Sequence, residues 1–449
     1  MDTLSDRRQR DQEVLDVVGV GFGPSNLALA IAIADHNAGA GPGKRLSARF
    51  VERQDHFGWH RGMLIDDATM QVSFLKDLVT LRNPVSPFSF LSYLHERDRL
   101  VDFINYGSAF PTRLEFHDYL EWAAAGFVDQ VDFGTEVLDV GPVPGEPGLL
   151  DVGTRSADGR RTVRRTRNIV LATGLVPRLP KGVRTGERVW HNSDLLTRVS
   201  EIAGSEPKRF AVVGAGQSAA ETVDYLHRTF PGTEVCAVFA RYGYSPADDS
   251  SFANRIFDPD AVDDFYTAPD VIKELILDYH ANTNYSVVDP GLIEELYRRH
   301  YREMVAGKER LRFYNVCRLV EVVDLGDQMK LTIESLVDGN REVLLADLVV
   351  YATGYRSADH RRLLGDVAVR CCRDTSGRLE IRRDYSVATD AEFTAGIYVQ
   401  GATEHTHGLS STLLSNIAVR SGEIVASIAG GETARVASVA EPSVPTAAR

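Results

Sequence analysis

The feature that most constrains the fold of this chain is a strand, a tight glycine turn and a helix in direct succession, a pattern that occurs twice. The first copy has a β-branched run at residues 15–20, a G-F-G turn and a helix-favouring segment at residues 28–34. The second has a strand at residues 210–213, a G-A-G turn and a helix reaching about residue 227. A G-x-G turn in this context is typical of dinucleotide-binding βαβ units. The sequence therefore predicts an α/β protein with two Rossmann-like dinucleotide-binding domains.

The first turn carries residues suited to a nucleotide pyrophosphate. Gly21 permits the tight turn, and Gly23 lets a pyrophosphate approach the backbone at the N-terminus of the helix. The third glycine of the general pattern is replaced, and the next strand ends in an acidic residue that can bond a ribose hydroxyl. We therefore expect contacts to the first nucleotide from Gly21, Gly23, Pro24, Asn26 and Glu52.

The second turn has different chemistry after its next strand. The strand at residues 234–240 ends in Arg241 rather than in an acid. Arginine can pair with a 2′-phosphate and stack on adenine, which favours NADPH over NADH; the alternative is a solvated loop residue. A chain with two nucleotide sites is typical of a flavoprotein reduced by a pyridine nucleotide. The prediction is FAD at the first site and NADPH at the second, the latter bound by Gly214, Gly216, Gln217, Ser218 and Arg241.

Two strands that end in Ala-Thr-Gly, at residues 170–174 and 349–354, flank the second turn. They predict a chain that returns to the FAD sheet on either side of an inserted domain, with Thr353 and Gly354 at the cofactor. The expected organisation is an FAD domain from 1–206 and 345–449 and an NADPH domain from 207–344. Within the latter we expect a small helical substrate region around 250–304. The tail after Gly430 is small, polar and proline-bearing, and we expect it to be disordered.

Composition excludes several classes of function. Acidic side chains outnumber basic ones by 63 to 50, so the net charge of -13 argues against a nucleic-acid partner. The longest apolar stretch, which begins at Leu27, is too short for a bilayer, and the charged N-terminus lacks a secretory signal. The 4 cysteines form no C-x-x-C pair. We expect a cytoplasmic protein with reduced thiols. Glu404, His405 and His407 have no companion ligand cluster, so no metal is expected.

Longer segments resemble a known family. They are DVVGVGFGPSNLALA from Asp16, MQVSFLKDLVTLRNPVSPFSFLSYL from Met70, FPTRLEFHDYLEWAA from Phe110, VVGAGQSAAE, NTNYSVVD from Asn282 and HGLSSTLLSNIAVRSGEI from His407. Together they resemble the microbial N-hydroxylating flavin monooxygenases, and most closely the L-ornithine N5-monooxygenases of hydroxamate siderophore biosynthesis. The resemblance extends over residues 16–428.

The resemblance implies a reaction. In that family NADPH reduces FAD, and the reduced flavin reacts with O2 to form a C4a-hydroperoxyflavin. The side-chain amine of L-ornithine attacks the distal oxygen, giving N5-hydroxyornithine and water. Such chemistry needs a site closed to water and an uncharged amine, which a partly apolar pocket favours by desolvation, without a dedicated acid or base. The resemblance also implies a homotetramer.

The resemblance assigns roles to individual residues. Lys76 resembles the lysine that pairs with the substrate carboxylate, and Asn254 and Asn284 resemble asparagines that bond the amino groups. A neutral amide suits a reacting amine, since a carboxylate would keep the amine protonated. Further contacts to flavin or substrate are implied for Met70, Gln71, Leu409, Ser410 and Ser411, without a choice between the two serines. Each role has a simpler alternative: Lys76 as a surface lysine, the asparagines as turn residues, and Trp59 and His60, which we expect at the flavin, as core packing.

Three other functions are compatible with parts of the sequence. L-Lysine N6-hydroxylation uses the same chemistry, and its substrate differs by one methylene, which is worth about 1–3 kcal/mol of discrimination. A pyridine-nucleotide disulfide reductase also joins FAD to NADPH, but it needs a redox-active dithiol by the flavin, and no C-x-x-C occurs in this sequence. A flavin-binding pseudoenzyme that serves as a redox sensor is the third. Retention of Lys76, Asn254 and Asn284 beside both glycine turns argues against it.

Overall fold

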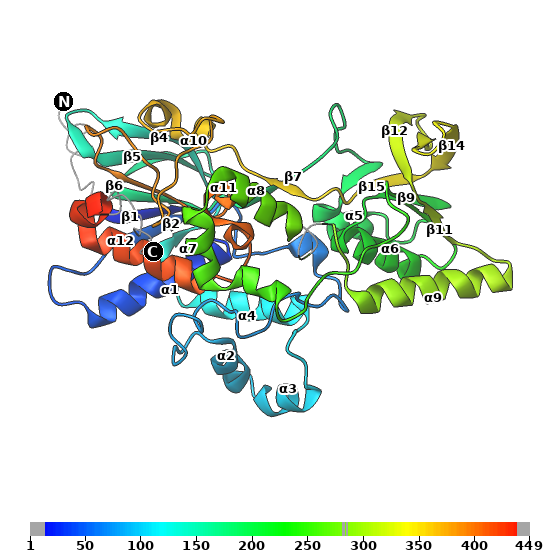
Figure 1. Ribbon diagram of the computed structural model, residues 1–449, viewed down its shortest axis with the longest axis horizontal. Coiled ribbons are helices and arrows are strands. Elements are labelled where there is room, and N and C mark those ends of the chain that lie inside the picture. The colour runs from blue at the N-terminus through cyan, green and yellow to red at the C-terminus, as the bar shows by residue number, and fades with distance from the viewer. Residues whose placement is uncertain (1–13, 281–282, 284–285, 438–449) are drawn as a thin grey trace, which may run out of the picture.

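The computed structural model describes residues 14–280, 283 and 286–437, and within it two units lie side by side (Figure 1). Each unit is built around a sheet whose central strands are parallel. A short two-stranded ribbon connects the units; it pairs β7 (Leu175–Pro177) with β16 (Tyr355–Ser357) in antiparallel fashion. This arrangement confirms the predicted α/β class with two Rossmann-like sheets.

The first unit contains a seven-stranded sheet in the order β3-β2-β1-β6-β5-β4, with β17 also paired to β6. β1 lies parallel to β2 and β6, whereas β4, β5 and β6 are antiparallel neighbours. The strands are β1 (Leu15–Val20), β2 (Ala48–Val51), β3 (Val131–Asp132), β4 (Thr135–Val143), β5 (Glu146–Ser156), β6 (Arg161–Leu171) and β17 (Gly396–Val399).

Helices cover this sheet because their apolar residues need a partner surface. α1 is apolar on all sides and is buried from Leu27 to Ile33, since it packs against the sheet, α12 and α4. α4 begins after Thr112, whose hydroxyl accepts a hydrogen bond from the Glu115 backbone N–H at 3.1 Å. The helices of the unit are α1 (Pro24–Gly39), α2 (Phe90–Glu96), α3 (Leu100–Tyr106), α4 (Arg113–Ala125), α10 (Arg361–Leu364), α11 (Glu404–His407) and α12 (Ile417–Ala437).

The second unit has a fully parallel sheet in the order β11-β10-β9-β15-β8. An antiparallel sheet of β12, β13 and β14 packs beside it. Its elements are β8 (Val189–His191), α5 (Leu195–Glu201), β9 (Arg209–Val213), α6 (Gln217–Thr229), β10 (Glu234–Val238), α9 (Pro290–Ala306), β11 (Leu311–Tyr314), β12 (Cys317–Asp324), β13 (Met329–Ser335), β14 (Arg341–Ala346) and β15 (Leu348–Tyr351).

The strand pairing differs from two expectations. β8 and β15 both belong to the second sheet, so this unit extends beyond the expected range of 207–344 at both ends. The strand of residues 349–354 therefore does not return the chain to the first sheet; it pairs with β9 and β8, and β17 makes the return instead. Sequence could not separate these options, because a short apolar strand pairs equally well in either parallel sheet.

The region expected to bind substrate divides between the two units. A short 3-10 helix (Ala253–Phe257), α7 (Pro259–Thr267) and α8 (Asp270–Tyr279) leave the second unit, and α7 contacts α11 of the first (Figure 1). α9 instead packs on α6 and β11 as part of the second unit. Only the 253–279 part of the expected region is therefore separate from the nucleotide-binding fold.

The C-terminal helix also differs from expectation. α12 extends to Ala437, with a non-helical backbone at Gly431 (φ 66°), where we expected disorder to begin. The remainder of the predicted tail, residues 438–449, lies outside the described residues.

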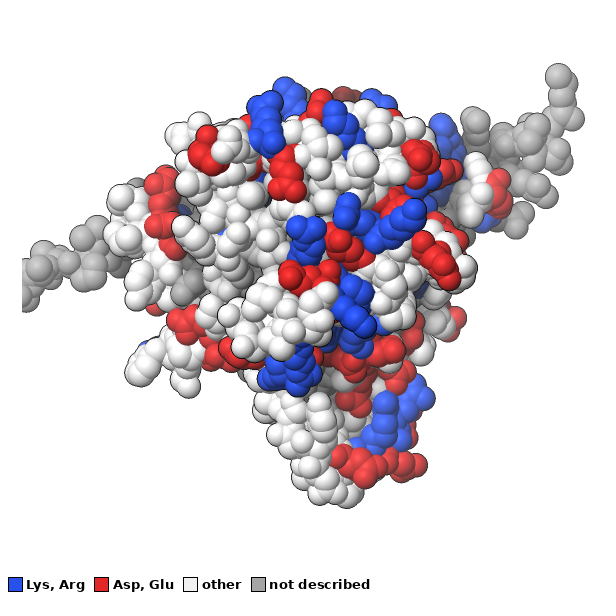
Figure 2. All heavy atoms as spheres, turned by 90° about the vertical axis from the view of Figure 1, so that its right-hand side faces the viewer, with Lys and Arg blue, Asp and Glu red and all other residues white. Residues whose placement is uncertain are grey.

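Charges on the end of the molecule formed by the second unit are mixed in sign, as Figure 2 shows. On α9, for example, Arg298 lies 2.6 Å from Glu295, and Arg299 pairs with Asp224 of α6 at 2.8 Å. Over the described part of the chain, no helix combines the length and the apolar character needed to cross a lipid bilayer.

Candidate active site

The first glycine turn is fixed by close backbone contact. Gly21 has a φ of 83°, and a Cβ at this position would lie 2.5 Å from the carbonyl oxygen of Ala172, so only glycine fits without strain. A Cβ on Gly23 would meet nothing within 4 Å. α1 begins directly after Gly23, with Pro24 in its first turn and no side-chain cap. An uncapped helix N-terminus beside open space is suited to a pyrophosphate.

The replacement of the third glycine by Asn26 has a structural reason. The buried Asn26 amide donates to the carbonyl oxygen of Gly21 at 2.7 Å and to that of Val20 at 3.3 Å. Its oxygen accepts from Gln400 Nε2 at 3.2 Å. Asn26 therefore holds the turn from inside and connects it to the end of β17.

Glu52 lies at the end of β2, beside the turn, with 8% of its surface exposed. One carboxylate oxygen accepts the Phe22 backbone N–H at 2.6 Å, and the other accepts that of Gln54 at 2.8 Å. Each oxygen keeps further acceptor capacity. The carboxylate is thus oriented by the turn itself, in the position expected for ribose recognition.

The second glycine turn repeats the design of the first. A Cβ on Gly214 would lie 2.3 Å from the carbonyl oxygen of Ala352. Both turns therefore press against the alanine of an Ala-Thr-Gly segment, which explains why that segment occurs twice. α6 begins after Gly216, again without a side-chain cap, so its N-terminal N–H groups at Gln217 and Ser218 are available to a phosphate.

Arg241 lies beside this second turn. Its guanidinium donates to the Ser286 carbonyl oxygen at 2.9 Å, and Ser286 in turn lies 3.3 Å from the Cβ position of Gly216. The Arg241 side chain is exposed and pairs with no carboxylate of the described residues. A guanidinium without a carboxylate partner at the turn is suited to a 2′-phosphate. On the adjoining connection between the units, Thr353 donates to Arg178, and the carbonyl oxygen of Gly354 accepts from the Arg178 backbone at 2.9 Å.

Lys76 approaches the segment that carries Asn254. Its Nζ lies 5.8 Å from the ring centroid of Phe257, which shares a 3-10 helix with Asn254. Burial lowers the pKa of Lys76, and nearby Asp258 opposes that shift. The Asn254 side chain donates to the Asp249 carbonyl oxygen at 2.7 Å, a local bond of the kind that turn residues make. Asn284 lies outside the described residues.

The turn that follows α11 is buried and contains unpaired polar atoms. Leu409, Ser410 and Ser411 are each at most 2% exposed. The Ser411 hydroxyl has no hydrogen-bond partner among the described residues, and neither does the Ser421 hydroxyl on α12. Buried hydroxyls without partners are costly, so their presence indicates a bound ligand or water here. The unpaired Ser411 hydroxyl is therefore a candidate contact to a bound group.

The remaining expected flavin contacts lie along one segment of the first unit. Met70 is buried and its backbone N–H donates to the Pro111 carbonyl oxygen at 2.9 Å, whereas Gln71 is exposed. Trp59 and His60 have ring centroids 4.7 Å apart, and His60 lies 6.1 Å from the Tyr355 ring on the connection between the units. His60 therefore lies against the connection between the units, whereas Trp59 packs on Phe116 in the core of the first unit.

Comparison with known proteins identifies the family. The model of the L-lysine 6-monooxygenase/L-ornithine 5-monooxygenase family matches residues 13–357. The chain belongs to this family. It is 40% identical to the L-ornithine N(5)-monooxygenase of Pseudomonas aeruginosa over 422 residues, which cover 92% of this chain and 94% of that protein.

Solved structures of the family have the same architecture. The ornithine N-hydroxylase of Kutzneria sp. 744, in its complex with reduced FAD, NADP+ and L-ornithine, superposes on this chain with a TM-score of 0.89 at 48% identity. That alignment covers 92% of this chain and 99% of the Kutzneria chain. The L-lysine 6-monooxygenase of Pseudomonas syringae superposes with a TM-score of 0.82 at 33% identity, covering 94% and 99% of the two chains.

One buried cation of this flavin-dependent monooxygenase was not predicted from sequence. Arg420, on α12, is 2% exposed. Its guanidinium donates to the Ser411 carbonyl oxygen at 2.8 Å, to Gln400 at 3.3 Å and to the Ser25 hydroxyl at 3.4 Å. Within the described residues no carboxylate lies at ion-pair distance from it. Arg420 lies in an apolar helix, so the sequence gives no sign that its side chain belongs to the site. The structure shows this, because the guanidinium reaches Ser25 beside the first glycine turn.

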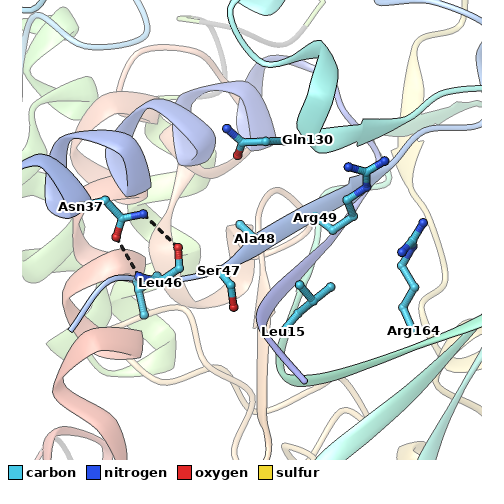
Figure 3. A pocket seen from close by; sticks show the side chains of 8 residues that line it. All are labelled: Leu15, Asn37, Leu46, Ser47, Ala48, Arg49, Gln130 and Arg164. Carbon is cyan, nitrogen blue, oxygen red and sulfur yellow. Dashed lines mark hydrogen bonds between the residues drawn. The ribbon is translucent and has the colours of Figure 1, made fainter. Parts of the chain in front are cut away.

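Two cavities in the described part of the monooxygenase lie at different places in the fold. One of about 490 Å³ opens at the amino ends of β1 and β2, where Leu15, Ser47 and Arg49 line it (Figure 3). Nucleotides bind at the carboxyl ends of such strands, so this cavity is separate from the site. The other, about 340 Å³, lies at the start of α6 and includes Gln217 and Glu221 in its lining.

The two histidines of α11 form hydrogen bonds with backbone carbonyl groups. His405 Nε2 lies 2.9 Å from the Leu379 carbonyl oxygen, and His407 Nε2 lies 3.2 Å from that of Arg383. Among the described residues, no group of three or more His, Cys, Asp or Glu side chains is arranged to hold a metal ion.

Proposed function

We propose that this monooxygenase binds FAD at the first glycine turn and NADPH at the second, and hydroxylates N5 of L-ornithine with O2. The observation that carries the proposal is the 48% identity to an ornithine N-hydroxylase across 92% of the chain. The two uncapped helix N-termini, at Gly23 and Gly216, support the two nucleotide sites. The product, N5-hydroxyornithine, is a precursor of hydroxamate siderophores or related natural products.

The cofactor-binding residues act by hydrogen bonding and charge. The backbone at Gly23 receives the FAD pyrophosphate, and the Glu52 carboxylate accepts a ribose hydroxyl. Arg241 pairs with the 2′-phosphate of NADPH, and the start of α6 receives its pyrophosphate. When bound, FAD supplies the redox and oxygen-activating chemistry.

The substrate-binding residues orient the amine and keep it uncharged. Lys76 pairs with the α-carboxylate of ornithine, which is the strongest available anchor at the far end of the molecule. Asn254 and Asn284 bond the amino groups as neutral amides and so do not stabilise the ammonium form. α7 packs on α11 of the first unit, and this contact excludes water from the space beside Ser411.

We propose ornithine rather than lysine as the substrate because the chain is more similar in sequence to an ornithine hydroxylase than to a lysine hydroxylase. The identity is 48% with the Kutzneria ornithine N-hydroxylase and 33% with the Pseudomonas syringae L-lysine 6-monooxygenase. One methylene distinguishes the two amino acids, which corresponds to about 1–3 kcal/mol of discrimination in a pocket. Initial rates of hydroxylamine formation from both, at equal concentration, test the choice. Faster turnover of lysine would reverse it.

The function itself is tested by three parallel measurements on the FAD-loaded protein. Hydroxylated ornithine, consumed NADPH and released H2O2 are measured together. We expect hydroxyornithine to account for most of the NADPH consumed. NADPH oxidation without a hydroxylated product, for every amine tested, would contradict the proposal and favour a redox sensor.

We further propose that the enzyme is a cytoplasmic homotetramer without a nucleic-acid or membrane partner. Large apolar side chains are exposed on two separate helices of the chain, which supports assembly through more than one surface. On α3, Val101 is 70% exposed and Ile104 66%; on α8, Val271 is 69% exposed and Leu275 61%. Light scattering on the purified protein distinguishes four copies of the 49.5 kDa chain from one or two.

A further inference from the structure

A short segment of the first unit packs its apolar side chains into the core of the second. We call residues 63–68 the strap. Met63, Ile65 and Ala68 of the strap belong to the same apolar cluster as Trp190 and Val223 of the second unit. Just before the strap, a Cβ on Gly62 would lie 1.9 Å from the Ser193 carbonyl oxygen. The two backbones are therefore in direct contact, and the units meet through a packed interface.

Arg113 joins this strap to the second unit. Its Nη1 donates to the Met63 carbonyl oxygen at 2.8 Å, and its backbone N–H donates to that of Ala68 at 2.7 Å. The same guanidinium forms two bonds with the Glu221 carboxylate on α6, at 2.8 and 3.0 Å. The Arg113 side chain is 13% exposed and that of Glu221 only 4%.

This pair restricts orientation as well as distance. A guanidinium that donates two parallel hydrogen bonds to a carboxylate fixes the relative angle of the two groups, which a single bond does not. Burial removes competition from water. α4 of the first unit and α6 of the second are therefore held in one orientation at this point.

The bonds continue from Glu221 to the second glycine turn. The carboxylate accepts Gln217 Nε2 at 3.0 Å, and the Gln217 oxygen accepts the Asp289 backbone N–H at 2.8 Å. Gln217 is the first residue of α6, directly after the turn. On the other side, the Met70 backbone donates to Pro111, only two residues before Arg113. The Arg113–Glu221 pair thus lies between residues expected at the flavin and residues expected at NADPH.

We propose that Arg113 and Glu221 are positioning residues that hold the NADPH-binding turn in register with the flavin, and so set the rate of hydride transfer. This inference rests on the proposed function, because it assumes NADPH at the second turn and FAD at the first. Neither side chain takes part in the chemistry. They act through α6 and the strap, whose orientation decides how the nicotinamide meets the flavin.

The chain offers a matched control that crosses the same boundary. Arg228, near the other end of α6, lies 3.0 Å from Asp67 of the strap. This pair is exposed, at 41% and 77% of the two side chains, and the hydrogen bonds recorded for Arg228 go to Asp67 and Asp224 rather than to Gln217. A contribution that is merely structural would be shared by both pairs, whereas positioning of the turn is specific to Arg113 and Glu221.

The experiment compares Glu221→Gln, Arg113→Lys and Arg228→Met in the FAD-loaded protein. Anaerobic flavin reduction by NADPH is followed by stopped flow, with reduction by dithionite, FAD content and melting temperature measured alongside. We expect Glu221→Gln to slow reduction by NADPH at least tenfold and to raise the H2O2 released per NADPH. Arg113→Lys keeps the charge but loses the paired geometry, so its rate should be intermediate. Dithionite reduction should not change, and Arg228→Met should stay within twofold of the wild type.

Two results would overturn the inference. One is wild-type reduction by NADPH in Glu221→Gln; the other is an equal loss in Arg228→Met. If Glu221→Gln does not fold, the double variant Arg113→Met/Glu221→Met replaces the pair by apolar side chains. Slow reduction in the folded double variant supports positioning, and a wild-type rate refutes it. A wild-type protein that NADPH does not reduce would instead refute the proposed function.

Discussion

Lys76 shows how one side chain combines an anchoring charge with an apolar setting. It is half-buried beside the Phe257 ring, and burial lowers its pKa while Asp258 opposes the shift. An ammonium in such surroundings gains from an anionic partner, because a charge-assisted hydrogen bond is worth about 1.5–3 kcal/mol. The structure brings it to the Asn254 helix, which proximity in sequence does not predict.

We therefore predict that Lys76→Ala raises the ornithine KM by roughly ten- to a hundredfold, the range that corresponds to losing a charged hydrogen bond. Flavin reduction by NADPH should remain nearly intact, because Lys76 is not near the second glycine turn. Steady-state kinetics and anaerobic stopped flow measure the two quantities. Lys308→Ala, at an exposed lysine after α9, is the control. An equal loss of flavin reduction in Lys76→Ala would show that Lys76 does not anchor the substrate.

His407 predicts a pH dependence of stability. The side chain is 1% exposed, and burial lowers its pKa to about 3. Below pH 6.5 the unfolded chain binds a proton at this histidine, whereas the folded chain remains neutral. The contribution of His407 to stability is therefore complete above about pH 6.5 and is lost as the pH falls toward 3.

Between pH 7.5 and 5.5, this single group should reduce the free energy of unfolding by about 1.4 kcal/mol. His407→Gln keeps an amide that can donate to the Arg383 carbonyl oxygen but does not titrate, so its loss over the same interval should be smaller by that amount. Urea unfolding of both proteins at the two pH values measures the difference. Identical pH dependence in the two proteins would contradict the assignment.

At the scale of elements, the two glycine turns have one design. Each first glycine has a positive φ, at 83° for Gly21 and 143° for Gly214, and each presses against the carbonyl of an alanine at a strand end. Asn26 completes the first turn with two hydrogen bonds to its backbone. The turns themselves were predictable because glycine spacing after a strand is a local signal; the role of Asn26 was not, because it depends on Gln400 far along the chain.

We predict that Gly21→Ala abolishes FAD retention. The strained backbone alone costs about 1–3 kcal/mol, and the added methyl group meets the Ala172 carbonyl oxygen. Gly39→Ala is the matched control, since its Cβ meets nothing within 4 Å at the end of α1; it should be neutral or stabilise the protein by up to about 1 kcal/mol. Flavin absorbance after purification measures both. FAD occupancy in Gly21→Ala equal to that of Gly39→Ala would disprove the close-contact argument.

At the scale of the whole molecule, the segment of α7 and α8 leaves one unit and docks on the other. Arg383 of the first unit pairs with Asp263 on α7 and, through two bonds of 2.9 Å, with Glu423 on α12. The Arg383 side chain is 25% exposed and is oriented by its two bonds to Glu423, whereas Asp263 is 61% exposed. The Arg383–Asp263 pair is one of the polar contacts that hold α7 against the first unit, and the adjoining 3-10 helix (Ala253–Phe257) contacts the turn containing Ser411.

We predict that Arg383→Met loosens α7 without disturbing the nucleotide sites. Amide exchange in residues 259–267 should become faster, and the ornithine KM should rise several-fold, while flavin reduction by NADPH is unchanged. Hydrogen exchange followed by mass spectrometry and steady-state kinetics measure these effects. Arg361→Met, which removes only a local exposed pair with Asp359, serves as the control. Unchanged exchange in α7 would contradict the docking role.

The two glycine turns and the α/β class could be predicted from sequence, because each depends on residues within one short segment. The position of Arg241 beside the second turn could be predicted for the same reason. The assignment of β15 to the second sheet and the continuation of α12 past Gly430 were not. A parallel strand of four apolar residues carries no information on its neighbour, and the helix gains its stability from packing on α1.

The same division applies to the site. Local chemistry predicted which residues bind nucleotides, since a glycine turn and the residue ending the next strand act over a few ångströms of backbone. Only the tertiary structure decided that Arg113 meets Glu221, that Arg420 reaches Ser25, and that Lys76 faces the Asn254 helix. These pairs are separated by more than 100 residues in sequence, so tertiary packing within and between the two units, rather than any periodicity along the chain, brings them into contact.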